Sequence, residues 1–156
     1  AEQIELKQTS LPLLVYGLII VVCRVVFASL PDRVPSLQLG AAALMAIAAG
    51  IGLVALWREP AGMLTGISIL AVGVAFCTPA FFSAIFATAA PSERGAAAGT
   101  ASIFLDLGLG LGPILLGVLA DAAGIPWAFG AASAVALAGA IWTLALAGRT
   151  SRSVHA

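Results

Sequence analysis

Residues 105–113 read Leu-Asp-Leu-Gly-Leu-Gly-Leu-Gly-Pro and lie inside an apolar run from Gly95 to Ala123. A run of this length can cross the roughly 30 Å of bilayer hydrocarbon as a helix, at about 1.5 Å per residue. A carboxylate at the centre of such a helix costs about 2.5–3.5 kcal/mol, so Asp106 indicates a group with a function or a partner. Glycine and proline soften a membrane helix and let another backbone approach closely. The stretch therefore predicts a membrane helix that packs or moves against a neighbour.

The composition of the whole chain also indicates a membrane protein. Of its 156 residues, 62% are hydrophobic and 9% are charged, whereas a soluble domain has about 25% charged residues. Mean hydropathy is +1.13. The apolar runs are continuous rather than alternating, which favours helices over the strands of a barrel. We therefore expect an all-α, polytopic membrane helix bundle.

Polar breaks divide the chain into five apolar runs that can each span a bilayer, at residues 11–30, 37–57, 61–90, 95–123 and 126–147. We predict five transmembrane helices joined by short connections into one bundle over residues 11–149. An outer segment, residues 1–10, precedes the bundle, and a cytoplasmic tail, residues 150–156, follows it.

Several residues at the ends of the runs predict where helices start, stop or bend. Ser10 and Ser92 are predicted helix caps, and Gly124 separates the last two runs. The third run is long and contains Thr78-Pro79 near its middle, which predicts a tilt or a proline kink.

The distribution of basic residues predicts the orientation. One side of the bilayer receives Arg33, Arg94, Arg149 and Arg152, and the other receives Lys7 and Arg58. The positive-inside rule then predicts a multi-pass protein of the cell (plasma) membrane with a cytoplasmic C-terminus. The chain starts at Ala1 on the outer side without an initiator methionine or a signal segment. We therefore expect a preceding helix, and interpret the chain as the C-terminal part of a longer membrane protein.

The sequence offers no basis for catalysis or nucleic-acid binding. Net charge is zero and the basic residues are scattered, so no nucleic-acid partner is expected. Cys23 and Cys77 lie in apolar runs without metal-ligand spacing, and apolar packing is the expected role of both. No nucleophile–base set or metal cluster can be assembled, and the alternating glycines do not follow a strand. We expect no enzyme activity, metal or cofactor.

Three segments resemble the major facilitator superfamily. Residues 28–33, Ala-Ser-Leu-Pro-Asp-Arg, are similar to its Gly-x-Leu-x-Asp-Arg loop, with Ala28 in the place of glycine. Residues 91–95, Pro-Ser-Glu-Arg-Gly, resemble the Pro-x-Glu-Arg-Gly start of a family helix. Residues 108–117, with Gly112-Pro113, resemble the glycine-proline motif of the fifth and eleventh helices. The resemblance implies helices eight to twelve of a twelve-helix secondary transporter, which moves a small solute by alternating access against an N-terminal half.

The resemblance implies gating or loop-motif roles for Asp32, Arg33, Glu93 and Arg94. Asp32 would latch helix ends across the two halves of the transporter. The alternative is that Asp32 and Arg33 are solvated charges at a helix end. Loss of transport with intact insertion, on replacement of Asp32, would separate these interpretations.

Two charges lie inside predicted membrane helices. Arg24 lies roughly 9 Å from the inner end of its helix, where it can snorkel to the interface or serve as a structural or coupling cation in the bundle. Asp106 lies deeper, at about 15 Å, and is too short to snorkel easily. We expect Asp106 to be buried, partnered or water-facing, with Arg24 or an absent helix as its partner. Coupling to a proton through Asp106 is a further hypothesis.

The remaining candidates are small residues and one cavity face. Gly108 and Gly112 share one face of their helix, which suits close packing. Asp106, Gly110, Pro113 and Gly117 share another. For this second face the resemblance implies a hinge for alternating access. The resemblance implies that the third run lines a central cavity and makes solute-contact candidates of Phe76, Thr78 and Ser83, although a Phe stripe can also be mere packing.

Two functions therefore remain open at this stage. One is a portion of a secondary transporter, acting in uptake or efflux with the lipid bilayer, its other half and a solute as partners. The other is a membrane scaffold or accessory subunit that does not transport. The sequence does not identify the substrate, the direction of transport or the coupling ion. An upstream reading frame that encodes about seven more helices would favour the transporter.

Overall fold

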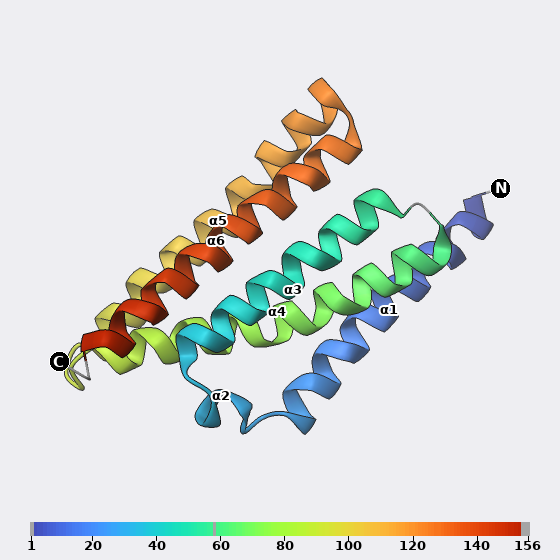
Figure 1. The fold of residues 1–156 in the computed structure, drawn as a ribbon. Helices are drawn as coiled ribbons and strands as arrows, with labels where there is room; N and C mark the ends of the chain where they lie inside the picture. Colours follow the sequence, from blue (N-terminus) through green and yellow to red (C-terminus); the bar gives the residue numbers. More distant parts are fainter. Residues whose placement is uncertain (1, 58, 154–156) are drawn as a thin grey trace.

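The computed structural model describes the backbone of residues 2–57 and 59–153, and the side chains of residues 10–30, 33–57 and 59–149. This described part is helical and contains no strand, which confirms the all-α prediction. Figure 1 shows the helices, which in chain order are α1 (Glu2–Val26), α2 (Leu30–Arg33), α3 (Ser36–Leu56), α4 (Pro60–Thr88), α5 (Arg94–Ala123) and α6 (Ile125–Ser153).

Four of the helices are long and apolar enough to cross a membrane, namely α3, α4, α5 and residues Ile125–Arg149 of α6. Their bounds agree with the last four predicted runs to within a few residues, apart from the end of α6. The apolar part of α1, Ser10–Val26, is shorter. The chain is therefore a membrane helix bundle, as its composition predicts.

Helix α1 differs from the prediction at both ends. It begins at Glu2, so Ser10 lies inside the helix and does not cap it. The reason is that residues 2–9 are mostly good helix formers, Glu, Gln, Leu and Lys. The helix ends at Val26 instead of Leu30, because a turn over residues 27–29 leads into the one-turn helix α2, which has a proline in its first turn.

The predicted cap at Ser92 is also wrong. The N-cap of α5 is Glu93, and no side chain makes the capping hydrogen bond. Ser92 lies one residue too early for its hydroxyl to reach the free N–H groups of the first turn. Gly124, in contrast, separates the last two helices as predicted, and caps the end of α5 with φ of 96°. A residue with a side chain rarely adopts that conformation.

The long helices pack side by side in the order α1, α4, α3, α6, α5. Helix α3 lies between α4 and α6, α1 packs on α4, and α5 packs on α6 (Figure 1). The connection through α2 passes close to α4. Helices α4 and α5 are consecutive, yet their contacts are few. Helix α5 therefore lies at one edge of the bundle.

Small residues make the centre of the bundle. Among the described side chains, those with no exposed area are all alanines: Ala41, Ala71, Ala75 and Ala140. At the α3–α4 interface, a Cβ added to Gly50 would lie 2.6 Å from the backbone nitrogen of Leu70 and 2.7 Å from the carbonyl oxygen of Gly66. These distances leave no room for a side chain, so glycine permits the close approach of the two helices.

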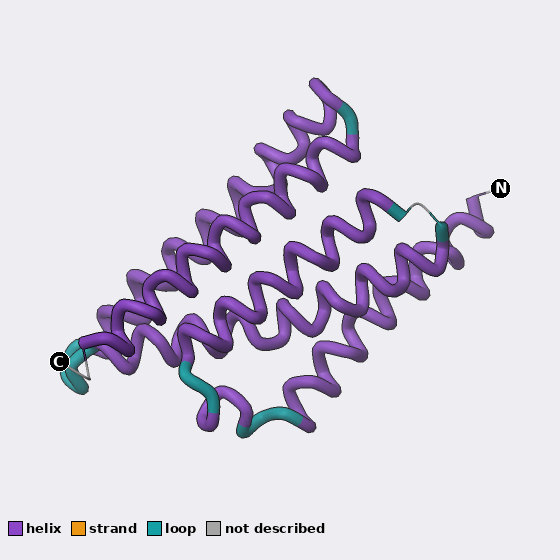
Figure 2. The backbone as a smooth tube through the Cα atoms, viewed as in Figure 1, coloured by secondary structure: helices purple, strands orange, loops and turns teal. Residues whose placement is uncertain are grey.

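Two further features hold the central helices. Ser133 of α6 donates a hydrogen bond of 2.8 Å to the carbonyl oxygen of Ala48 in α3, which ties two helices together. Helix α4 continues through Pro79, and Figure 2 shows its two halves running in different directions. Pro79 has no N–H to bond the carbonyl of Ala75, so a bend at this position has the expected cause.

Candidate functional site

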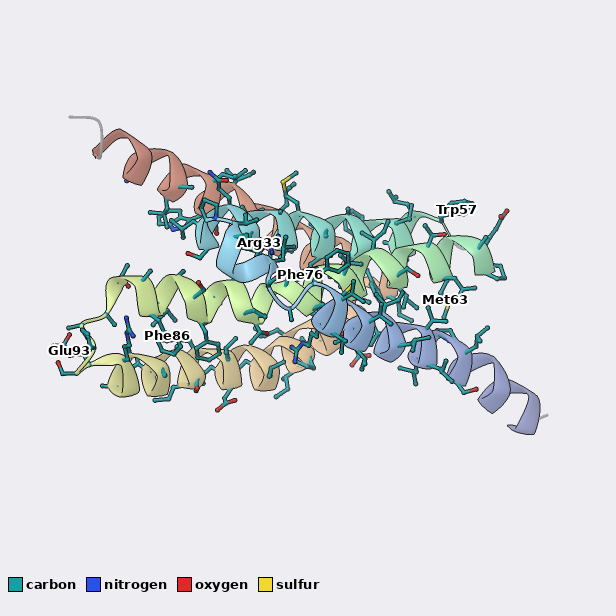
Figure 3. All side chains as sticks on the ribbon, turned by 90° about the horizontal axis from the view of Figure 1, so that it is seen from below. Arg33, Trp57, Met63, Phe76, Phe86 and Glu93 are labelled. Carbon is teal, nitrogen blue, oxygen red and sulfur yellow. The ribbon has the colours of Figure 1, made fainter. Side chains whose placement is uncertain are left out.

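The three predicted solute contacts of α4 do not share one environment. The ring of Phe76 packs edge-on against Phe27, with ring centroids 6.3 Å apart (Figure 3). Phe27 lies in the turn after α1, so Phe76 helps to fix the α1–α2 connection against α4. Thr78 and Ser83 are half-buried and lie about 140° apart around the helix axis. Phe76 and Ser83, seven residues apart, share a face of α4 as predicted from the spacing, whereas Thr78 lies on another face.

The hydroxyls of Thr78 and Ser83 differ from other hydroxyls of α4. Those of Thr65, Ser68 and Thr88 donate to backbone carbonyls in their own helix. Among the described residues, Thr78 and Ser83 make no hydrogen bond. Both hydroxyls are thus available to a solute, a water molecule or another helix.

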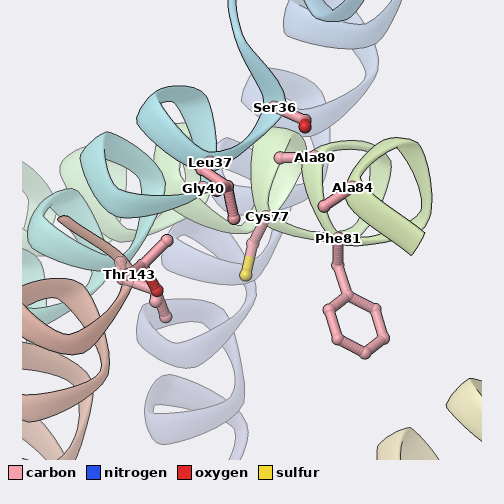
Figure 4. Close-up of a pocket in the computed structure, with 9 residues that line it drawn as sticks. Ser36, Leu37, Gly40, Cys77, Ala80, Phe81, Ala84 and Thr143 are labelled. Atoms are coloured by element: carbon pink, nitrogen blue, oxygen red, sulfur yellow. The ribbon is translucent and has the colours of Figure 1, made fainter. Parts of the chain in front are cut away.

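A cavity of about 130 Å³ opens between α3, α4 and α6 (Figure 4). It is largely apolar, and Thr143 at its rim already donates to the carbonyl of Gly139 at 2.8 Å. None of the predicted solute contacts lines it; the lining residues include Gly40, Cys77, Ala80, Phe81 and Ala84. The sequence signal for this cavity was the set of small residues in α3 and α4, Gly40, Ala80 and Ala84. Cys77 and Cys23 are both free thiols, and Cys23 is buried, as apolar packing requires.

The two membrane charges do not meet. Arg24 and Asp106 are both exposed, and no ion pair joins them within the described side chains. Arg24 lies on α1 and Asp106 on α5, at different edges of the bundle. The described chain neither buries Asp106 nor supplies a partner for it.

The glycines of α5 lie in open space. A Cβ added to Gly108, Gly110, Gly112 or Gly117 would meet no atom within 4 Å, and Ala101 is the buried residue of this helix among those described. Close packing by Gly108 and Gly112 therefore does not occur within the described chain. The closely packed glycines are in α3 and α4 instead, at Gly50, Gly66 and Gly73. Their signal in the sequence is spacing: Gly66, Gly73 and Ala80 recur every seven residues and share a helix face.

The predicted loop motifs lie at the ends of helices. Arg33 ends α2 and is exposed, and the side chain of Asp32 lies outside the described residues. Glu93 and Arg94 are exposed at the start of α5. Figure 3 shows Arg33 and Glu93 well apart. The two motifs are therefore separate surface features of the described chain.

The chemistry available here is that of binding and movement. Within the described residues, no three His, Cys, Asp or Glu side chains gather in a way that could hold a metal ion. What the arrangement offers is a bent helix with two unpaired hydroxyls, a small apolar cavity, and one exposed helix with glycines and a carboxylate.

Comparison with known proteins identifies the family. The profile of the Major Facilitator Superfamily matches residues 2–155. The chain is similar to uncharacterized MFS-type transporters of Burkholderia mallei (strain SAVP1) and Burkholderia pseudomallei (strain K96243), each 31% identical over 143 residues. The match covers 92% of this chain and 35% of each relative, so the chain spans about a third of the length of these curated relatives. No solved structure matches the chain significantly. The family that the sequence resembles is thereby confirmed, and the chain belongs to the major facilitator superfamily.

Proposed function

We propose that this chain is a portion of a secondary active transporter that moves a small solute across the cell membrane by alternating access. The family match over residues 2–155 carries the proposal. The curated relatives are named transporters, and the matched stretch makes up 35% of each of them. The helices described here would then act with further helices that complete the carrier.

The placement of charged residues supports an orientation for this proposal. Arg33, Arg94 and Arg149 lie at the ends of α2, α5 and α6 that up-and-down connectivity assigns to one side. Trp57 and Trp127 are exposed near the opposite ends, where interfacial aromatic residues are expected. The basic side would be cytoplasmic, which places the C-terminus inside. Lys7, Arg58 and Arg152, which also entered the prediction, have side chains outside the described residues.

Helix α4 is the proposed contact with solute. Its unpaired hydroxyls, Thr78 and Ser83, flank Pro79, the residue at which the helix can change direction. Phe76 is a weaker candidate because its ring already packs on Phe27. Asp32, Arg33, Glu93 and Arg94 would act in the loops that gate the cytoplasmic side, and Asp106 could carry a coupling proton.

The reading frame upstream of Ala1 gives the first test. We expect it to encode about seven further helices in frame, and a stop codon there would favour a scaffold or accessory subunit. The complete protein is then assayed for uptake and efflux of a panel of solutes in energised membrane vesicles. Thr78→Val and Ser83→Ala should each weaken transport while insertion is unchanged. Asp106→Asn protein that still accumulates solute against its gradient would exclude proton coupling through Asp106.

A further inference from the structure

The fit between α3 and α4 becomes looser beyond Pro79. Before the proline, a Cβ added at Gly73 would lie 2.7 Å from the carbonyl oxygen of Ala43, so no side chain fits between the helices. Beyond the proline, a Cβ added at Gly40 would lie 3.8 Å from the Cβ of Ala80, which is an ordinary van der Waals contact. The bend in α4 therefore leaves space between the two helices.

The cavity of about 130 Å³ between α3, α4 and α6 occupies this space (Figure 4). Its wall in α4 includes residues from both sides of Pro79, since Cys77 precedes the proline and Ala80, Phe81 and Ala84 follow it. Along α3 the lining residues extend from Ser36 to Leu44, a rise of roughly 12 Å. None of the described residues that line the cavity is charged.

The few polar groups of this wall do not suit water. A buried water molecule needs two to four polar partners. The hydroxyl of Thr143 already donates to the carbonyl of Gly139 at 2.8 Å, and the thiol of Cys77 hydrogen-bonds only weakly. Ser36 is the first residue of α3, so its hydroxyl lies at one end of the cavity. The chemistry of the wall therefore favours an apolar occupant over water.

The size and position of the cavity indicate which apolar occupant fits. An apolar protein cavity of about 150 Å³ stays dry and binds benzene, and the volume here is similar. Phe81, at 37% exposed, can pack edge-on against an aromatic occupant. Both α3 and α4 are long and apolar enough to span a membrane, so the cavity lies within the hydrocarbon layer, where uncharged apolar molecules concentrate. An acyl chain of a lipid has many more carbon atoms than a benzene ring, and only its end would fit.

We infer that this cavity is a binding site for a small uncharged molecule, about the size of one benzene ring, that enters from the bilayer. The site is separate from the proposed solute contacts, because neither Thr78 nor Ser83 lines it. The inference therefore goes beyond the proposed function. Its test measures binding without transport.

The thiol of Cys77 is the reporter for the test. Cys23→Ala leaves one cysteine in the chain, and the variant is placed in phosphatidylcholine vesicles. Its reaction with methyl methanethiosulfonate is followed by mass spectrometry. Saturating benzene should slow this reaction at least tenfold, because it fills the cavity beside the thiol. Triisopropylbenzene also dissolves in the bilayer but is too large for the cavity, and should leave the rate unchanged.

Two alanines of α4 provide matched substitutions, since Ala84 lines the cavity and Ala87 is exposed. Ala84→Leu should fill the cavity, so that benzene no longer changes the rate at Cys77, whereas Ala87→Leu should preserve the effect of benzene. Ala84→Val adds fewer atoms and should weaken the effect, which keeps the test valid if the leucine variant fails to fold. A thiol introduced by Ala87→Cys in a chain with Cys77→Ala should react at the same rate with and without benzene.

Three results would overturn the inference. One is a rate at Cys77 that benzene does not change. The second is equal slowing by benzene and triisopropylbenzene, or equal slowing at positions 77 and 87, which would mean that benzene acts on the bilayer. The third is a bound phospholipid, detected by native mass spectrometry, that Ala84→Leu releases and benzene does not displace. That result would assign the cavity to an acyl chain instead.

Discussion

Replacing Gly50 with alanine should push α3 and α4 apart. The new Cβ would lie 2.6 Å from the nitrogen of Leu70, 2.7 Å from the carbonyl oxygen of Gly66 and 2.9 Å from the Cα of Leu70. All three are backbone atoms and cannot rotate away. Ordinary contact begins near 3.4 Å. The distance between the two helices at this point must therefore increase by about 0.8 Å.

Overpacking of this kind costs about 1–3 kcal/mol, and alanine returns up to about 1 kcal/mol through its higher helix propensity. Gly110→Ala is the matched control, because its Cβ enters open space and its propensity gain is the same. The difference between the two variants therefore isolates the packing cost. We predict that Gly50→Ala is less stable than Gly110→Ala by about 2 kcal/mol, which is roughly a 30-fold change in the unfolding equilibrium.

The assay is reversible unfolding of the purified chain in mixed micelles, titrated with sodium dodecyl sulfate and followed by tryptophan fluorescence. Equal extents of helix in both variants, measured by circular dichroism before titration, confirm that both fold. A difference below about 0.5 kcal/mol would refute the claim that Gly50 permits close contact of α3 and α4.

Three further predictions use the same titration. Ser133→Ala removes the hydrogen bond between α6 and α3 and should cost about 0.6 kcal/mol, the average for such bonds in membranes; a stabilised variant would contradict this. A double-mutant cycle of Phe27→Leu and Phe76→Leu should give a coupling of about 0.5–1.5 kcal/mol for the edge-on pair, and additive effects would exclude the contact. Gly124→Ala forces a side chain into φ of 96° and should cost about 1–3 kcal/mol, so an unchanged midpoint would mean that the turn has another conformation.

Much of the fold could be predicted because a helix that crosses the bilayer requires a long apolar run, which is visible in the sequence. The bounds of α3, α4 and α5 fall within a residue or two of the predicted runs. The start of α1 was missed because helix propensity, not hydropathy, extends it to Glu2. The predicted cap at Ser92 was wrong because a shift of one residue removes the geometry that a cap requires.

The candidate site was less predictable, since glycine patterns do not say whether a partner is present. Gly110 and Gly73 occupy similar local sequences, yet a neighbouring backbone covers Gly73, whereas no described atom lies within 4 Å of a Cβ added to Gly110. The sequence likewise grouped Phe76 with Thr78, although one packs on Phe27 and the other has a free hydroxyl within the described residues. Only tertiary contacts distinguish such cases.

Membrane topology tests the account most directly, because every proposal here requires the helices to cross the bilayer in alternation. Single cysteines replace Glu59, Ala123, Ser29 or Ser92, one at a time, in a chain whose native Cys23 and Cys77 are changed to alanine. Intact cells are then labelled with a membrane-impermeant maleimide. We predict labelling at positions 59 and 123 from outside, and at 29 and 92 only after permeabilisation. Labelling of positions 92 and 123 from the same side would contradict the membrane crossing of α5 and, with it, the proposed carrier.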